Sequence, residues 1–274
     1  MYRIDTQFKE LIIIGNGFDL NLGLKTSYGD FIQSESFLSL PSTSNLFPSY
    51  LRAANSDSNW IDIENELKRV SAQYTSPEED FYQLCEKLKE YVSRITYDKL
   101  NRDSHAFKFI SSLMGVDFLI LDFNYTNTTK ILLKEIGFPD DMIAKTLIKV
   151  HGSIEEGNII FGVEDNADIV PAHVYFKKSF SRTFKGINLF NEAEKIETIK
   201  IFGHSLGDTD FMYFHKLFQA ISNEGYDGSS KKIHLYHYGR ESYKNLHIQL
   251  EKLTDNNLFV LKQNNEFIPI DTSI

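Results

Sequence analysis

Four short segments of the sequence carry residue types that could bind a nucleotide or do acid–base chemistry. They are Gly15-Asn16-Gly17, Asn124-Tyr125-Thr126, His151-Gly152 and Gly203-His204-Ser205, and each directly follows a run of apolar residues. Glycine adopts φ > 0 without strain and leaves no Cβ in the way of a ligand. A backbone turned in this way at the end of a parallel strand can bring its N–H groups against a phosphate.

The first of these turns follows four consecutive aliphatic residues, Leu11 to Ile14. Such a run predicts a strand buried on both faces, as in parallel sheets. The turn resembles a dinucleotide fingerprint, but Leu20 stands where the third glycine would be, so a tight turn without a ligand is the alternative. Asp19 favours the ligand, because an acidic residue at that turn must either cap the helix or meet a ligand hydroxyl.

Each of the other turns also has a structural explanation. Asn124 could cap the helix that begins nearby, His151 could be a hydrogen-bonded surface histidine, and Gly203-His204-Ser205 could be a tight turn. For Asp208 and Asp210 we favour helix capping over ligand contact. Glu64, on the helix of Trp60, is expected to belong to a face that packs against the sheet.

The elements that must position these segments alternate between strands and helices. Residues 28–32 open a helix with a capping box, Ser27 with Asp30, that stops before Pro41, and 41–59 is a loop. Helices are expected at about 60–70, 77–95, 104–114, 128–136, 210–222 and 242–253, and strands at 11–14, 116–123, 146–150, 158–161, 198–202, 232–238 and 258–261. This order predicts an α/β, Rossmann-like fold with an open, mostly parallel sheet.

We expect residues 1–274 to form a single domain, with residues 32–113 as a helical insertion between the first two strands. Since ligands of open α/β sheets bind outside the carboxyl ends of the strands, the four turns should converge there. The apolar residues Phe81, Leu84 and Leu88 of the insertion could face a partner helix or a second subunit. Packing within their own domain is the favoured alternative.

Composition narrows the function further. The formal charge of −9 and the pI near 5.4 argue against nucleic acid as a partner. The single cysteine, Cys85, excludes an intramolecular disulfide and a cysteine-based zinc ribbon, and we see no acidic cluster with the spacing of a metal site. The sequence shows neither a signal peptide nor a membrane span, so we expect a cytoplasmic protein with no membrane contact.

The four turns, in this order, resemble the sirtuin-like NAD-binding fold, which is also that of deoxyhypusine synthase. Within it the chain is most similar to the AbiH family of bacterial abortive-infection proteins. The similar segments are IIGNGFDLNLGLKTSYGDF, the Trp60-x-Asp62-x-Glu64 helix start, FNYTNT, HGS and GHSLGDTD. They extend from residue 11 to about residue 212, and the last sixty residues add only a continuing α/β pattern.

The resemblance implies that NAD is the ligand and assigns roles within one pocket. Asn124 would orient a water or a ribose hydroxyl, and His151 would be the general base. Breaking the N-glycosidic bond builds an oxocarbenium-like centre, to which a positioned dipole and a base are suited. The residues expected to hold NAD are Gly15, Asn16, Gly17, Asp19, Gly152, Gly203, His204 and Ser205, with no metal.

The sequence also departs from sirtuins. It has no cysteine quartet for a zinc module, which argues against peptide deacylation, and Tyr125-Thr126 replaces the Ile-Asp that usually follows the sirtuin Asn. The leading hypothesis is an antiphage effector that hydrolyses NAD and releases nicotinamide. The alternative is a nucleotide sensor or binding module without turnover. In the effector, the insertion would be the regulator or the homo-oligomer contact, with a phage-derived trigger or a second copy of the chain as its partner.

Overall fold

The computed structural model describes residues 4, 7–41, 48, 51–52, 63–73, 78–223 and 229–273. Most of the predicted loop at 41–59 lies outside the described residues, as do Trp60 and the first residue of the helix predicted at 77–95. The four turns all lie inside them.

The described strands form one open sheet in which every pairing is parallel. The strands are β1 (Glu10–Ile14), β2 (Phe118–Asp122), β3 (Leu147–Lys149), β4 (Thr198–Phe202), β5 (Lys232–His237) and β6 (Glu266–Asp271), in the order β3-β2-β1-β4-β5-β6. This is the strand order of the doubly wound dinucleotide-binding fold, with its topological switch point between β1 and β4. The predicted α/β, Rossmann-like fold is therefore confirmed.

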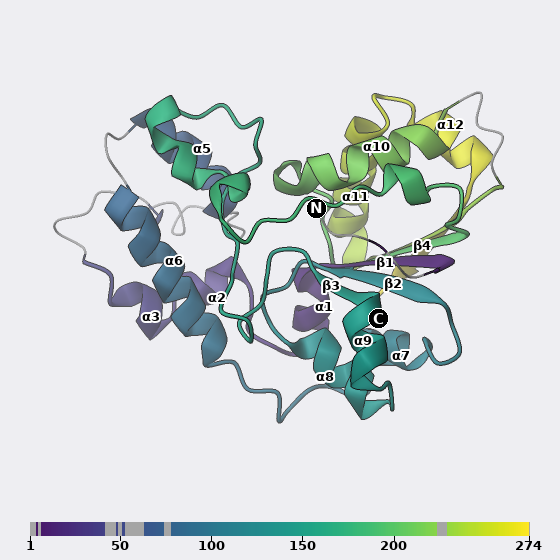
Figure 1. Cartoon of the computed structure of the whole chain (residues 1–274), viewed down its shortest axis with the longest axis horizontal. Coiled ribbons are helices and arrows are strands. Elements are labelled where there is room, and N and C mark those ends of the chain that lie inside the picture. The colour runs from purple at the N-terminus through teal and green to yellow at the C-terminus, as the bar shows by residue number, and fades with distance from the viewer. Residues whose placement is uncertain are drawn as a thin grey trace.

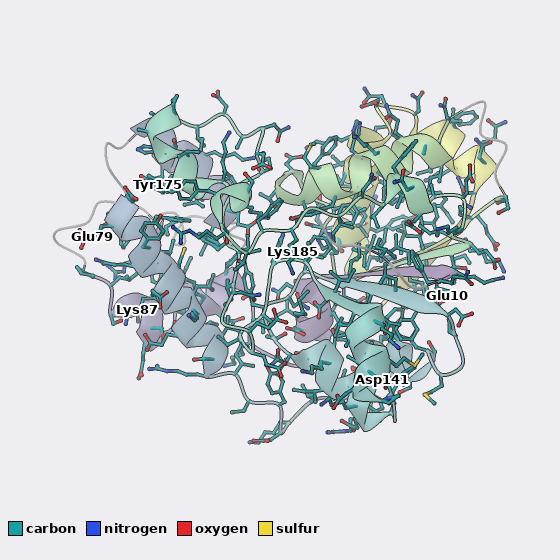
Figure 2. All side chains as sticks on the ribbon, in the orientation of Figure 1. Glu10, Glu79, Lys87, Asp141, Tyr175 and Lys185 are labelled. Carbon is teal, nitrogen blue, oxygen red and sulfur yellow. The ribbon has the colours of Figure 1, made fainter. Side chains whose placement is uncertain are left out.

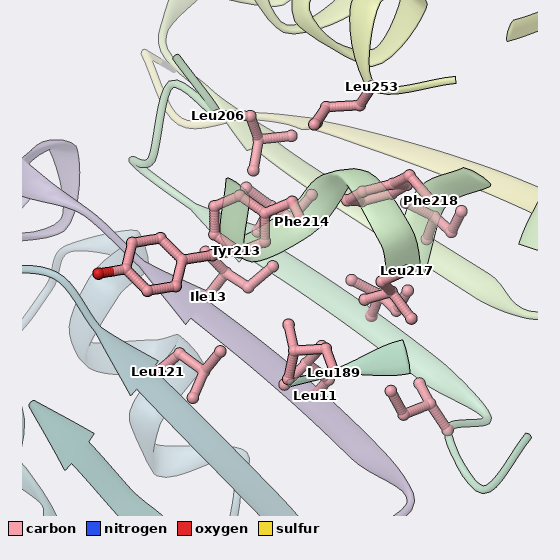
Figure 3. Close-up of a cluster of buried hydrophobic side chains, with 14 of the residues drawn as sticks. Leu11, Ile13, Leu121, Leu189, Leu206, Tyr213, Phe214, Leu217, Phe218 and Leu253 are labelled. Atoms are coloured by element: carbon pink, nitrogen blue, oxygen red, sulfur yellow. The ribbon is translucent and has the colours of Figure 1, made fainter. Parts of the chain in front are cut away.

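Helices cover both faces of the sheet, which lies between two helical layers in Figure 1. Leu11 and Ile13 face the layer of α10 (Phe211–Ile221), α11 (Gly239–Leu253) and α12 (Leu258–Asn264), part of which Figure 3 shows. Ile12 and Ile14 face the other layer. That layer consists of α1 (Asn16–Asn21), α7 (His105–Ser111), α8 (Thr128–Glu135) and α9 (Asp140–Thr146). Because successive strand residues point to opposite faces, the aliphatic run of β1 is buried on both sides, as predicted.

A third group of helices lies beside the sheet, on the left of Figure 1, and we call it the insertion helices. It consists of α2 (Tyr28–Ile32), α3 (Glu35–Leu38), α5 (Ile63–Gln73) and α6 (Glu78–Ser93). Their apolar core also includes residues from the segment 161–176, such as Tyr175, which Figure 2 shows among these helices. α7 falls within the predicted 32–113 range but packs against the sheet instead.

Phe81, Leu84 and Leu88 are buried in the core of the insertion helices, so this face is covered by the chain itself. The predicted helix from Ser27 to Pro41 is divided into α2 and α3, because Ser34 caps a second helix start. At α2 the expected capping box of Ser27 and Asp30 is present.

Two of the predicted strands are wrong. Residues 158–161 form no strand, because the chain leaves the sheet edge at β3 and carries Phe161 into the core of the insertion helices. Residues 258–261 belong to the helix α12, and the final strand is β6. β6 contains Pro269 and lies at the edge of the sheet, where a residue without an N–H donor is tolerated. A short apolar run does not distinguish a strand from a buried helix.

Between β3 and α10, apart from β4, the chain is irregular and contains four short 3₁₀ turns. They are Pro171–Phe176, Lys178–Phe180, Phe190–Glu192 and Asp208–Asp210. The turn at 178–180 and the turn at 208–210 both bring charged side chains to the carboxyl edge of the sheet, where Lys178 pairs with Asp210.

Candidate functional site

The four predicted turns meet at the carboxyl edge of the sheet. The side-chain amide of Asn124 donates to the carbonyl oxygen of Gly15 at 3.2 Å, and the N–H of Gly17 donates to the carbonyl oxygen of Gly203 at 2.9 Å. The ring of Phe123 lies 5.1 Å from that of His151 and 4.3 Å from that of His204. The expected convergence of the strand ends is therefore observed.

The glycines of the first and fourth turns pack backbone against backbone. A Cβ on Gly17 would lie 2.6 Å from the Cα of Gly203, and a Cβ on Gly203, whose φ is +65°, would lie 2.3 Å from the backbone nitrogen of Phe18. The close approach that glycine permits here is thus an approach between two turns of the same chain.

This packing also uses the amides that were expected to hold a pyrophosphate. The N–H of Gly15 donates to Phe202 at 3.0 Å, that of Gly17 to Gly203 at 2.9 Å, and that of Phe18 to Gly15 at 2.9 Å. A phosphate bound by these amides would have to displace the turn that contains Gly203. The switch point between β1 and β4 is filled by protein in this structure.

A buried group of charged and imidazole side chains lies next to these turns, and we call it the charged cluster. Its centre is Asp210, whose Oδ1 accepts from the ammonium of Lys178 at 2.9 Å. Lys178 is also 3.0 Å from Glu64 on α5. His151 places Nε2 3.0 Å from Oδ1 of Asp210, and His204 places Nε2 3.3 Å from Oδ2. The cluster therefore connects the insertion helices to the ends of β3 and β4.

The role expected for the two aspartates after β4 is wrong. The side chain of Asp210 caps neither the 3₁₀ turn nor α10, because it is turned inward to Lys178. Asp208 is exposed and pairs with Lys252 at 3.0 Å. Glu64 was assigned to a face packed on the sheet, but it is buried against Lys178 at the junction between the insertion helices and the sheet.

Burial and neighbouring charge set the protonation of the cluster. Burial, with the charge of Lys178 beside it, lowers the pKa of His151 to about 4, although Asp210 opposes the shift. Burial acts against ionisation of Asp210, but Lys178 and His151 hold its pKa well below the usual range. Burial also acts against the charge of Lys178, yet the two carboxylates raise its pKa. At neutral pH the cluster thus contains an ammonium, an Asp210 carboxylate and a neutral His151.

Asp19 lies in a second buried polar group, under the turn of Asn124. Its Oδ2 accepts from the Thr126 hydroxyl at 2.6 Å, while Oδ1 is buried without a hydrogen-bond partner. Burial raises the pKa of Asp19 to about 7, and the nearby Asp122 adds to the shift while the Thr126 hydroxyl opposes it. Asp122 is paired with Lys149 at 2.8 Å.

We expect the variant Asp19→Asn to be more stable than the wild type above pH 7, and to lose this advantage as the pH falls. Because the folded-state pKa of Asp19 is raised, its contribution to stability is full below the unfolded pKa and is lost as pH rises through about 7. Relative to wild type, the free energy of unfolding of Asp19→Asn should rise by about 3 kcal/mol between pH 5 and pH 8. Urea unfolding at both pH values measures this difference, with Asp98→Asn, an exposed carboxyl, as the control. An equal effect at the two pH values would contradict the raised pKa.

Three further residues predicted to hold NAD have other structural roles in this structure. Asn16 accepts a hydrogen bond from the Thr26 hydroxyl. Gly152 has φ +72°, and a Cβ there would meet the carbonyl oxygen of Asn158. Ser205 is exposed, and its hydroxyl accepts from the N–H of Gly207.

Lys178 is absent from the site predicted from the sequence, and the roles predicted for Glu64 and Asp210 differ from those in the structure. Lys178 is 3% exposed, which is rare for a lysine and marks it as part of a paired site. The only feature of the sequence that hinted at a buried cation was the presence of several acidic residues in GHSLGDTD and in the helix start before Glu64. Because Lys178 lies in an irregular segment, no helical or strand periodicity of the sequence indicates that it is buried.

Among the described residues, no group of three or more His, Cys, Asp or Glu side chains is arranged to hold a metal ion. None of the described helices is long and apolar enough to cross a bilayer. A surface depression between the end of α3 and α6, lined by Leu40, Tyr82 and Lys87, involves none of the predicted site residues.

The part of the chain that contains these residues matches a known protein family. The chain matches the family described as bacteriophage abortive infection AbiH over residues 11–118 and 73–228. These matches cover most of the chain and include the four turns and the charged cluster, so the chain belongs to the AbiH family. No curated protein matches the chain.

Proposed function

We propose that this member of the AbiH family is an abortive-infection effector that binds NAD and hydrolyses the bond between nicotinamide and ribose. The observation that carries the proposal is the placement of Asn124 and His151, which follow the neighbouring strands β2 and β3 at the carboxyl edge of a dinucleotide-binding topology. Both side chains are held in place, Asn124 by Gly15 and His151 beside Asp210.

In the proposed reaction a water molecule attacks the anomeric carbon as the bond to nicotinamide breaks. The products are nicotinamide, ADP-ribose and one proton. His151 takes the proton from the water, and Asn124 orients the water or a ribose hydroxyl while positive charge develops on the sugar. Neutral His151 has the lone pair that a base needs.

The site is closed in this structure. His151 is 4% exposed and Asn124 is 6% exposed, so NAD must displace part of the protein to reach them. Closure around the ligand would exclude bulk water and leave the single attacking water that Asn124 orients. The same closure would keep NAD away from Asn124 and His151, and so keep a toxic activity inactive, until infection opens the site.

The second candidate function is a nucleotide-binding module without turnover. The observation that favours it is the low pKa of His151, which burial and Lys178 bring to about 4. An imidazole with this pKa accepts a proton poorly at neutral pH, since the ideal base has a pKa near the operating pH.

Purified full-length protein incubated with NAD separates the two functions. Nicotinamide release followed by chromatography, together with NAD binding measured by calorimetry, should show both binding and turnover if the chain is the proposed hydrolase. Tight binding of NAD without release of nicotinamide would identify the module. Absence of both would contradict NAD as the ligand, and other nucleotides would then be tested in the same assay.

A further inference from the structure

Asp210 receives three contacts from different parts of the fold, although the sequence assigned it only to helix capping. Lys178 and His151 both approach Oδ1, and His204 approaches Oδ2. Asp210 and both histidines are more than nine-tenths buried. A buried carboxylate in such a position determines where the protons of its neighbours lie.

The proton of His204 can be placed from the backbone. Its Nδ1 accepts the N–H of Leu206 at 2.9 Å, so a neutral His204 must carry its proton on Nε2. That Nε2 faces Oδ2 of Asp210. His204 is therefore a donor to Asp210 and has no free ring lone pair to act as a base.

The same reasoning applies to His151. Its Nε2 is 3.0 Å from Oδ1 of Asp210, although the contact is poorly aligned as a hydrogen bond. If Nε2 were unprotonated, its lone pair would face the lone pairs of a carboxylate at this distance, and the two would repel. A proton on Nε2 turns the same contact into an attraction.

We propose that Asp210, held as a carboxylate by Lys178, is a positioning residue that fixes the Nε2–H tautomer of His151 and leaves Nδ1 as the atom that accepts a proton. The use of Nδ1 as a base rests on the proposed function, whereas the tautomer does not. Asp210 acts through His151 and needs no contact with the substrate.

Lys178 is the cation that neutralises the buried carboxylates of the charged cluster. It satisfies Asp210 and Glu64 together, and its ammonium also donates to the carbonyl oxygen of Thr209 at 3.2 Å. Removing Lys178 would leave two buried carboxylates without their cation, which is strongly destabilising. Asp210→Asn is the better probe because it keeps the shape, and Lys178 retains Glu64 and the carbonyl oxygen of Thr209 as partners. The one oxygen of the amide is needed by His204, whose Nε2–H is fixed by the N–H of Leu206.

The test is the ring-proton position of His151 measured by NMR on protein labelled with ¹⁵N-histidine. The chain has eight histidines, and the His151 signals are assigned by their absence in His151→Gln. At neutral pH we expect Nε2–H in the wild type. In Asp210→Asn the amide oxygen accepts from His204 in place of Oδ2, so the amide nitrogen takes the place of Oδ1 and can donate to Nε2 of His151. The proton of His151 should then move to Nδ1. Asp208→Asn, which removes the exposed carboxylate two residues away, should leave the wild-type tautomer unchanged.

Nicotinamide release is measured on the same samples. We expect Asp210→Asn to lose at least 10²-fold in turnover number, as expected for a misplaced base, and Asp208→Asn to keep the wild-type rate. A wild-type His151 that carries its proton on Nδ1, or one whose tautomer is unchanged in Asp210→Asn, would overturn the inference. The wild-type spectrum alone decides the matter if Asp210→Asn does not fold. If the tautomer follows Asp210 but the wild type never cleaves NAD, the positioning role stands and the proposed hydrolase fails.

Discussion

Replacing His151 by alanine should lower the release of nicotinamide from NAD by 10²–10⁴-fold, which is the usual contribution of a general base. The expectation follows from the position of His151 after β3, beside Asp210, in the part of the fold where ligands bind. Because the imidazole is buried, the alanine variant also leaves a cavity and should lose roughly 1–3 kcal/mol of stability. His151→Gln keeps most of the volume and separates the loss of the base from the loss of packing.

A matched control is available on the surface. His215 pairs with Asp255 at 3.1 Å, as His151 does with Asp210, but its side chain is 26% exposed on α10. His215→Ala should turn over NAD at the wild-type rate. Rates are compared at saturating NAD, and folding is checked by thermal unfolding. A His151→Ala protein that cleaves NAD at the wild-type rate would exclude His151 as the base.

In that case His204 would not be the replacement base. Its Nδ1 is occupied by the N–H of Leu206 and its Nε2 faces Asp210. Asn124→Ala should reduce turnover at least as much as His151→Ala if Asn124 orients the attacking water. It also removes the hydrogen bond to Gly15, so the effect on substrate affinity should accompany the effect on rate.

The fold was predictable because its signals are local. The aliphatic run at β1 is buried on both faces, and glycine or polar residues mark where β1, β2 and β4 end. The two wrong strands were short apolar runs without a distinguishing period. Residues 258–261 became helical, and the chain placed the proline-containing β6 at the edge instead.

The site was predictable only in part, because its charges come from elements far apart in sequence. The turns with Asn124 and His151 follow strands, so the topology brings them together. Lys178 lies in a 3₁₀ turn and Glu64 on an insertion helix, and only the folded chain shows that they meet at Asp210. Two carboxylates can be buried close together only if a cation such as Lys178 pairs with both. No rule of sequence spacing predicts which residues form such a group.

At the glycine turns the sequence predicts a close approach, but not the protein segment that makes this approach in the structure. The sequence predicted that Gly15 and Gly17 allow a close approach to a phosphate. The structure shows that a Cβ on Gly15 would lie 2.6 Å from the Cα of His204, so the close approach is made by the turn after β4. Substitutions here should therefore affect folding before they affect a ligand.

We expect Gly17→Ala and Gly203→Ala to be strongly destabilising. At Gly17 the added Cβ would meet the Cα of Gly203 at 2.6 Å, and neither backbone can move aside without disturbing the ends of β1 and β4. Gly203→Ala adds the cost of φ +65° for a non-glycine residue. Losses of roughly 3 kcal/mol or more are expected, since overpacking and backbone strain act together.

Two glycines of the same chain separate these causes. Gly186 has open space around its Cβ position, and Gly137 has open space but φ +100°. Gly186→Ala should be nearly neutral, and Gly137→Ala should cost about 1–2 kcal/mol from its backbone conformation alone. Urea unfolding of the four variants gives the comparison. If Gly17→Ala unfolds at the wild-type urea midpoint but no longer binds NAD, the turn serves the ligand directly, and its packing against Gly203 must open when NAD enters.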